Sequence, residues 1–262
     1  GWTVTPAAPC LGAELAGPDL SRPLTGDELR AIRAALLRYE VIFFRGQASM
    51  QPADHLRLAA AFGEVQLHQA YPHVPGFPAI TVLENDRDNP SLIEQWHTDM
   101  TFRPCPPLGS ILHAIVVPAE PNEQGAQAGD TEFFSMAAAY EALDEGLKAR
   151  LADLSAVHSF EKGFAESLAK PGGRERLKHM LDANPPVQHP VLRTHPESGK
   201  TSLFVNRLFT SHIIDIERAE SDALLAQLYE HMEQPRFRCR FQWTEGAIAF
   251  WDNRITQHRP GE

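Results

Sequence analysis

The sequence lacks any hydrophobic run long enough to cross a membrane. A membrane-spanning helix needs about 18 or more consecutive apolar residues, whereas apolar stretches such as Val41–Phe44 are only a few residues long. The first residues, Gly1–Pro6, have neither the basic start nor the apolar stretch of a secretory signal peptide. These absences predict a soluble, cytoplasmic protein that does not bind to membranes.

Cysteine pairs and an excess of positive charge are also missing. The three cysteines, Cys10, Cys105 and Cys239, are far apart and form no CxxC pair, which argues against a disulfide framework and a thiolate zinc site. The formal net charge is −10, from 24 Lys and Arg against 34 Asp and Glu. Proteins that neutralise nucleic-acid phosphates usually have the opposite balance, so nucleic acid is not an expected partner.

What the sequence does contain is the composition of a globular protein. Its 262 residues, 43% of them hydrophobic, are enough for one large domain or two small ones. The 12 histidines and 21 prolines are unusually frequent. Many prolines suit a fold of short strands and turns, and many histidines justify a search for a metal site.

The hydrophobic pattern predicts a mainly β fold with flanking helices. Thr25 and Glu28 have the spacing of a capping box, and Leu29, Ile32 and Leu36 then recur at helical spacing. Further helices are expected over residues 51–62, 136–154 and 219–233, and strands over residues 41–44, 79–83, 95–102, 110–117, 131–134, 202–206, 237–243 and 247–251. The regular strand–helix alternation and the glycine-rich first turn of a doubly wound sheet are absent. This pattern favours a jelly roll decorated by helices.

The most informative short motif is His97-Thr98-Asp99. In a strand, residues i and i+2 point to the same face, so an imidazole and a carboxylate are expected side by side. His258, which follows another apolar strand, offers a second imidazole. Two histidines and one carboxylate leave three positions open on a metal, as in non-haem Fe(II) oxygenases. Zn²⁺ would also suit this ligand set.

An isolated HxD pair is weak evidence, because a chain with 12 histidines and 34 acidic residues forms such pairs by chance. A surface strand with outward polar residues would give the same pattern. The remaining histidines considered are expected to be structural or solvated: His113, His158, His179, His189, His195, His212 and His231.

Several longer motifs strengthen the metal hypothesis. They are Trp96–Phe102, Pro106–Ser110, Gly129–Thr131, Ala138–Leu143, His189–Val191, Arg193–Pro196, Leu203–Asn206, Trp251–Arg254 and Thr256–His258. In these motifs and in their order the chain resembles the taurine/2-oxoglutarate dioxygenase family, which includes alkylsulfatase and aryloxyalkanoate dioxygenase relatives. The resemblance extends from Gly12–Glu14 to His258, nearly the whole chain.

The resemblance implies a fold, a cofactor and a reaction. The fold is a double-stranded β-helix, in a single domain over residues 1–262, with Fe(II) held by His97, Asp99 and His258. Thr131 would contact a carboxylate of the cosubstrate 2-oxoglutarate, and O₂ would complete the reaction, which hydroxylates a substrate and releases succinate and CO₂. The family's second 2-oxoglutarate ligand, an Arg, and a C-terminal strand would lie beyond Glu262.

The resemblance also implies a substrate pocket and its class of ligand. His68, Tyr71, Phe164 and Phe209 match pocket positions, although His68 is also compatible with a simple turn residue. Taurine-using relatives have Asn at the position of Ile93 and Ser at the position of Gly163. This difference predicts a less polar organic anion than taurine: an alkyl sulfonate, a sulfate ester or an aryloxyalkanoate. A homo-oligomer is expected.

Two other functions remain open at this point. One is a degenerate jelly roll that binds a metal or a ligand without turnover. The other is a metalloprotein without redox chemistry.

Overall fold

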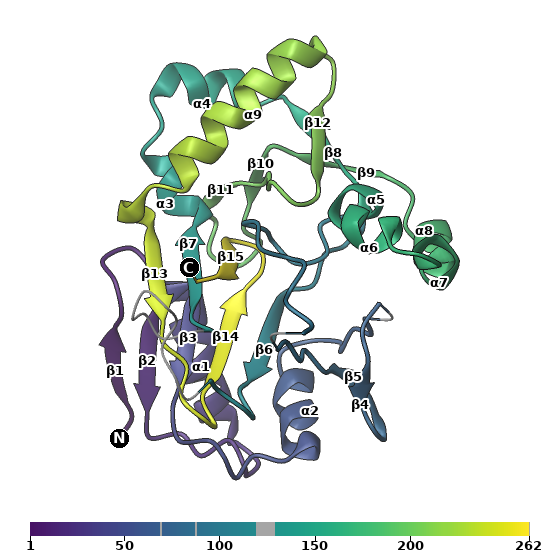
Figure 1. Ribbon diagram of the computed structural model, residues 1–262. Coiled ribbons are helices and arrows are strands. Elements are labelled where there is room, and N and C mark those ends of the chain that lie inside the picture. Colours follow the sequence, from purple (N-terminus) through teal and green to yellow (C-terminus); the bar gives the residue numbers. More distant parts are fainter. Residues whose placement is uncertain (69, 87, 119–128, 262) are drawn as a thin grey trace.

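The structure is a computed structural model that describes residues 1–68, 70–86, 88–118 and 129–261 (Figure 1). The fold is mainly β with helices, and the helices lie at the top, at the right and in the lower part of the view in Figure 1. Within the described residues, no helix is long and apolar enough to span a membrane.

The largest sheet joins strands from the two ends of the chain. Its order is β1 (Thr3–Pro6), β2 (Ala13–Ala16), β3 (Val41–Phe44), β14 (Ile248–Asp252) and β6 (Gly109–His113). β2 and β3 are parallel, and the other neighbours are antiparallel. This sheet matters for the candidate metal centre described below, because one turn follows the end of β14 and another precedes the start of β6.

Strand β3 is buried on both faces, and its side chains alternate between two cores. Ile42 and Phe44 pack in one cluster with Ile32 and Leu36 of helix α1 (Gly26–Tyr39), as the strand period of two requires. The predicted capping box of α1 is confirmed, with reciprocal bonds between Thr25 and Glu28. Helix α2 (Pro52–Ala60) covers the same face, slightly shorter than predicted.

The opposite face of the large sheet packs on a second, antiparallel sheet. This sheet has the order β13 (Arg238–Phe241), β7 (Thr131–Ser135) and β15 (Thr256–Pro260). Phe43 of β3 stacks on Phe241 with ring centroids 4.0 Å apart, and Phe133 and Trp251 belong to the same buried cluster. The two sheets therefore enclose an aromatic core between them.

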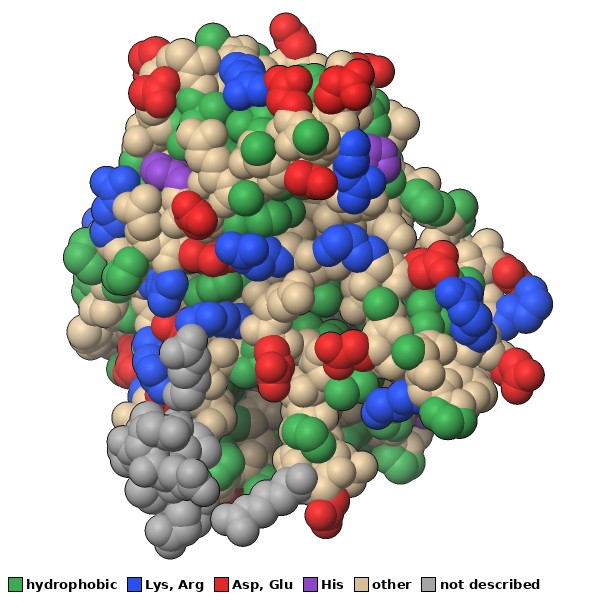
Figure 2. Space-filling view, turned by 45° about the horizontal axis from the view of Figure 1, so that its top comes forward, with side chains coloured by type: hydrophobic (Ala, Val, Ile, Leu, Met, Phe, Trp, Pro, Cys, Tyr) green, Lys and Arg blue, Asp and Glu red, His purple; other side chains and the backbone are tan. Residues whose placement is uncertain are grey.

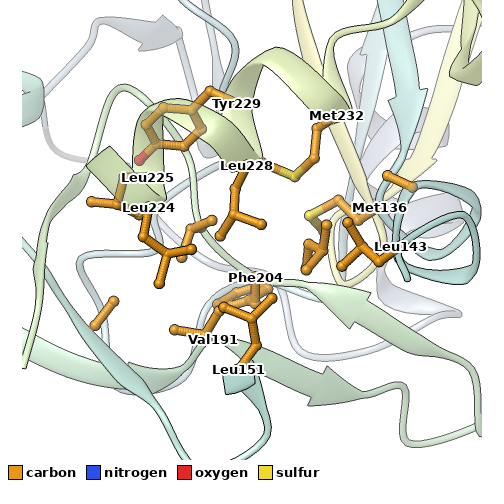
Figure 3. Close-up of a cluster of buried hydrophobic side chains, with 14 of the residues drawn as sticks. Met136, Leu143, Leu151, Val191, Phe204, Leu224, Leu225, Leu228, Tyr229 and Met232 are labelled. Carbon is orange, nitrogen blue, oxygen red and sulfur yellow. The ribbon is translucent and has the colours of Figure 1, made fainter. Parts of the chain in front are cut away.

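A helical layer packs over the other end of the molecule. It contains α3 (Met136–Glu141), α4 (Glu145–Leu151) and α9 (Arg218–Met232), and its buried cluster includes Met136, Phe204 and Leu228 (Figure 3). The strands beneath are β8 (Ser155–His158), β9 (Val187–Pro190), β10 (Leu192–Thr194), β11 (Thr201–Leu203) and β12 (Thr210–Ile213). The single helix predicted over 136–154 is wrong, because the Asp144 side chain accepts from the Leu147 N–H and starts a new helix.

Short helices and a hairpin lie at the right of the view in Figure 1. They are α5 (Phe160–Gly163), α6 (Ala165–Ala169), α7 (Gly173–Arg176), α8 (Lys178–Ala183) and the hairpin of β4 (His73–Val74) and β5 (Phe77–Thr81); a 3₁₀ turn (Pro235–Phe237) precedes β13. On the face shown in Figure 2, acidic and basic side chains are interspersed.

One predicted strand is wrong in a way that matters for the site. Residues 95–102 form no strand: His97 makes a single antiparallel bridge to His258, and a turn with Met100 at φ 54° follows. The other expected strands are present with shifted ends, as in β5, β6, β11 and β13.

Candidate metal centre

His97, Asp99 and His258 converge on one point. Their potential ligand atoms all lie within 4.8 Å of one another. Asp99 Oδ1 is 3.4 Å from His97 Nε2 and 3.5 Å from His258 Nε2. Reciprocal backbone bonds hold the two histidines together, at 3.1 Å from His97 N to His258 O and 2.9 Å from His258 N to His97 O. The pair is therefore aligned by the backbone bridge rather than by the continuous strand that the sequence predicts.

The second carboxylate oxygen of Asp99 is held away from the histidines. Ser110 Oγ donates to Asp99 Oδ2 over 2.9 Å, and the indole N–H of Trp251 donates to the same atom over 3.3 Å. Oδ1 is consequently the oxygen that faces the two imidazoles. Such outer hydrogen bonds orient metal ligands, and the sequence prediction assigned no such role to Ser110 or Trp251.

The ring of His97 is oriented for metal binding. Its Nδ1 lies 2.9 Å from Gln95 O and donates to it, so Nε2 is the ring nitrogen that faces Asp99. The second imidazole, His258, has its Nδ1 buried without a hydrogen-bond partner among the described residues. Its Nε2 is the atom that faces Asp99.

Electrostatics favour the metal-binding protonation states. Burial lowers the pKa of His258 to about 4, against a raising effect of Asp99, so His258 is neutral near pH 7. For Asp99, burial acts to raise the pKa, but His258, His97 and Ser110 outweigh it and the pKa is lowered. A neutral imidazole and an ionised carboxylate are the forms that bind a metal ion. Two imidazole nitrogens and one carboxylate oxygen fit Fe(II).

Asn253 clamps the backbone of Asp99. Its Oδ1 accepts from Asp99 N and its Nδ2 donates to Asp99 O, both over 2.8 Å. The turn that carries Asn253 is itself fixed by Asp252, which is bonded to His195 Nε2 over 2.8 Å and to the Arg254 guanidinium over 2.9 Å. The prediction that His195 is structural is consistent with this contact. The sequence motif Trp251–Arg254 includes this turn, but the motif did not predict the hydrogen bonds from Asn253 to the Asp99 backbone.

A buried polar network holds the turn that follows Asp99. Thr101 Oγ1 lies 2.8 Å from His158 Nδ1 and accepts from Asn206 Nδ2 over 3.1 Å. Its carbonyl lies 2.7 Å from His189 Nε2. Met100, at φ 54°, lies in the same turn, directly before Thr101. The structural interpretation of His158 and His189 is consistent with these contacts, whereas Thr101 and Asn206 received no individual role.

Thr131 lies on the same sheet face as His258. In the β7–β15 register Phe133 pairs with His258 and Thr131 pairs with Pro260, and side chains of paired residues and of residues two apart share a face. The Oγ1 of Thr131 accepts from the indole N–H of Trp243 over 2.9 Å. Its own hydroxyl hydrogen is therefore available to donate to an anionic ligand.

The predicted substrate residues lie together, and one of them is in ring contact with His97. They are His68, Tyr71, Ile93, Phe164 and Phe209, all in or against one aromatic cluster or in ring contact with it. The ring centroids of His68 and Tyr71 are 4.8 Å apart, and those of Phe209 and His97 are 6.3 Å apart. Burial lowers the pKa of His68 to about 4 and raises that of Tyr71 to about 12. Both side chains are therefore uncharged near pH 7.

A surface hollow adjoins this cluster. It has a volume of about 500 Å³ and is lined by Tyr71, Pro72, Val82, Leu83, Glu84, Asn85, Asp86 and Asn89. Tyr71 belongs both to the hollow and to the aromatic group. A ligand that contacts the aromatic group could thus extend past Tyr71 toward solvent.

Comparisons with known proteins identify the class. Residues 3–261 match the family described as taurine catabolism dioxygenase TauD, TfdA family. The chain is 35% identical to an alkylsulfatase of Acinetobacter baylyi over 251 residues, covering 95% of this chain and 76% of that protein. It is 36% identical to an alpha-ketoglutarate-dependent sulfate ester dioxygenase of Pseudomonas putida over 258 residues, covering 97% and 82%.

A solved structure agrees with these relatives. The crystal structure of a taurine dioxygenase from Burkholderia xenovorans superposes with a TM-score of 0.80 at 35% identity, covering 99% of this chain and 82% of that one. The chain belongs to the TauD, TfdA family. It is therefore an enzyme, a non-haem iron dioxygenase that depends on 2-oxoglutarate.

Proposed function

We propose that this dioxygenase hydroxylates a small organic anion of the alkyl sulfonate, sulfate ester or aryloxyalkanoate class, with Fe(II) bound by His97, Asp99 and His258. The observation that carries the proposal is the convergence of these three side chains within 4.8 Å, with an aromatic cluster in ring contact with His97. Bound Fe(II) would supply the open coordination positions at which 2-oxoglutarate and O₂ react to release succinate and CO₂.

The chain's own residues orient and shield the reactants. Ser110 and Trp251 fix Asp99 Oδ2, which leaves Oδ1 for the metal. Thr131, polarised by the Trp243 indole, would donate its hydroxyl hydrogen to a carboxylate of 2-oxoglutarate. The rings of Phe102 and Phe209, whose centroids are 5.1 Å apart, form an apolar wall that excludes water from the reacting C–H bond.

The substrate class follows from the polarity of the pocket. Ile93 supplies an apolar side chain, and His68 and Tyr71 are uncharged near neutral pH. Such a pocket suits a hydrocarbon chain or an aromatic ring better than an ammonium group. The similarity to an alkylsulfatase and a sulfate ester dioxygenase supports the same class.

We further propose that the two packed sheets form a double-stranded β-helix, or jelly roll, and that residues 1–262 are one domain. The similarity to a taurine dioxygenase structure supports this fold. A cytoplasmic location, a homo-oligomeric state and the absence of a nucleic-acid partner remain predictions.

Succinate production tests the proposal. Purified protein with Fe(II), ascorbate and 2-oxoglutarate is incubated with hexyl sulfate, pentanesulfonate, a phenoxyalkanoate or taurine, and succinate is measured. We expect succinate release that requires both Fe(II) and an organic anion. Metal binding without succinate from any of the four would favour the degenerate, non-catalytic jelly roll or a redox-inactive metalloprotein.

A further inference from the structure

Asp99 lies at the point where the pairing of its segment with β15 breaks off. His97 and His258 exchange both backbone hydrogen bonds, over 3.1 and 2.9 Å. A continued antiparallel ladder would pair Asp99 with Thr256 in the same way. The hydroxyl of Thr98 instead donates to the Thr256 carbonyl, over 3.0 Å. The backbone N–H and C=O of Asp99 are therefore left for a partner other than the strand.

The side-chain amide of Asn253 is that partner. Its Oδ1 accepts from Asp99 N and its Nδ2 donates to Asp99 O, both over 2.8 Å. One amide thus pairs the donor and the acceptor that a neighbouring strand would otherwise have paired. Asn253 is 1% exposed, so water has little access to compete for these two bonds.

Asn253 is itself held on a hydrogen-bonded turn. Its backbone N–H donates to Leu108 O over 2.9 Å, and its Nδ2 also lies 3.4 Å from Pro107 O. The preceding residue, Asp252, is buried and accepts two bonds from the guanidinium of Arg254, each over 2.9 Å. Because an asparagine side chain has only two torsions, the position of this turn sets the position of the backbone that the amide holds.

We propose that Asn253 is a positioning residue of the metal centre, whose amide sets the distance of the Asp99 carboxylate from the two histidines. This inference rests on the proposed function, because it takes His97, Asp99 and His258 as the Fe(II) ligands. With the amide in place, Asp99 Oδ1 lies 3.4 Å from His97 Nε2 and 3.5 Å from His258 Nε2. A shift of the Asp99 backbone changes this spacing, and metal affinity depends on it.

Metal binding by the full chain tests this role. Co(II), which is stable in air and replaces Fe(II) as the probe, is titrated by calorimetry into metal-free wild type, Asn253→Ala and Asp99→Ala. We expect the Kd for Co(II) to rise about 10- to 100-fold in Asn253→Ala, and further when the ligand itself is lost in Asp99→Ala. Asn253→Ser is a second variant, whose hydroxyl is too short to bridge Asp99 N and O, and it should show the same rise.

Hydrogen exchange gives a readout that requires no metal. In the metal-free protein the amide of Asp99 donates to Asn253 Oδ1. Without that acceptor, the Asp99 amide should exchange at least about tenfold faster in Asn253→Ala than in wild type. A general loss of stability would instead speed exchange across the protein.

Gln47→Ala is the matched control. Gln47 is also a buried amide that pairs with the backbone of another segment, since its Oε1 accepts from Leu20 N and its Nε2 donates to Pro18 O, each over 2.9 Å. That segment contains none of the three candidate ligands. Both alanine variants should lose stability in urea, but Gln47→Ala should keep the Kd for Co(II) and the exchange of the Asp99 amide within about twofold of wild type.

Each outcome decides the inference. Wild-type affinity for Co(II) in Asn253→Ala overturns it, as does unchanged exchange of the Asp99 amide or an equal loss of affinity in Gln47→Ala. Co(II) binding that depends on Asn253, in a protein that releases no succinate with Fe(II), would contradict the proposed hydroxylation but support the positioning role. A wild type that binds no Co(II) would contradict both.

Discussion

Gly163 lies against the ring of Phe209, with no room for a side chain between them. A Cβ at position 163 would be 2.2 Å from Cε1 and 2.3 Å from Cδ1 of that ring. The backbone of Phe209 is held by a hydrogen bond as well, because its N–H donates to Asn206 Oδ1 over 2.8 Å. The absence of a side chain at position 163 therefore leaves the space that the ring of Phe209 occupies.

Gly163→Ser should displace Phe209 and disturb the pocket. We expect a loss of roughly 1–3 kcal/mol in the free energy of unfolding, as for overpacked cores, and a higher KM for hexyl sulfate. Urea denaturation and succinate kinetics measure the two effects. Gly63→Ala is the control, because a Cβ there meets nothing within 4 Å. Wild-type stability in Gly163→Ser would show that the ring moves without cost.

Removing any one candidate metal ligand should abolish turnover. His97→Ala, Asp99→Ala and His258→Ala each delete one of three convergent donors, so Fe(II)-dependent succinate release should fall to background while the circular dichroism spectrum is retained. The exposed His179→Ala should behave as wild type. Near-wild-type activity in any of the three ligand variants would show that the assignment of that ligand is wrong.

Thr131→Val should weaken cosubstrate binding. Loss of the hydroxyl donor is expected to cost about 0.5–1.5 kcal/mol, and more where a carboxylate is left unpaired, measured as a raised KM for 2-oxoglutarate. Iron affinity should change little, and Thr131→Ser should restore the KM. An unchanged KM in Thr131→Val would remove Thr131 from the cosubstrate site.

Glu40 should make stability depend on pH. Glu40 is 2% exposed, its Oε2 has no hydrogen-bond partner among the described residues, and burial raises the pKa of its carboxyl to about 7 from 4.5. While the carboxyl is protonated in both the folded and the unfolded protein, its titration does not change the free energy of unfolding. Because the pKa is higher in the folded protein, stability should decrease as pH rises from about 4.5 through 7.

Glu40→Gln should remove this cost. Above pH 7 the variant should be more stable than wild type, by on the order of 3 kcal/mol, and the difference should vanish near pH 4.5. Thermal or urea unfolding at several pH values gives the comparison, with the exposed Glu245→Gln as the control. A pH-independent difference would mean that Glu40 does not titrate in this range.

Local patterns predicted the parts of this molecule that local interactions determine. The capping box of Thr25 and Glu28 and the buried strand Val41–Phe44 follow from neighbouring residues alone. The break at Asp144 was missed because its capping preference competes with a helical apolar pattern on both sides. The spacing of apolar residues alone does not distinguish one continuous helix from two helices separated at Asp144.

The candidate site was predicted for a partly incorrect reason. His97 and Asp99 do converge, yet a bridge to His258 and a turn align them, not a strand. The clamp by Asn253 joins positions 154 residues apart. Contacts of this kind depend on the tertiary fold, so a motif can mark the residues without revealing which atoms they hold.

Taurine should be a poor substrate. Ile93 packs against the pocket cluster where a hydrogen-bonding partner for an ammonium would be needed, and a site without that partner discriminates against the amine. The catalytic efficiencies for taurine, pentanesulfonate, hexyl sulfate and a phenoxyalkanoate give the comparison. Higher efficiency for taurine than for all three others would contradict the role given to Ile93.

The most direct measurement is the stoichiometry of the coupled reaction. Hydroxylation of hexyl sulfate at the carbon beside the ester oxygen gives an adduct that collapses to hexanal and sulfate, so one sulfate should appear for each succinate. We predict equal yields of sulfate and succinate with wild type and neither product above background with Asp99→Ala. Succinate without any oxidised organic anion from the panel, or equal yields in the absence of Asp99, would contradict the proposed site and reaction.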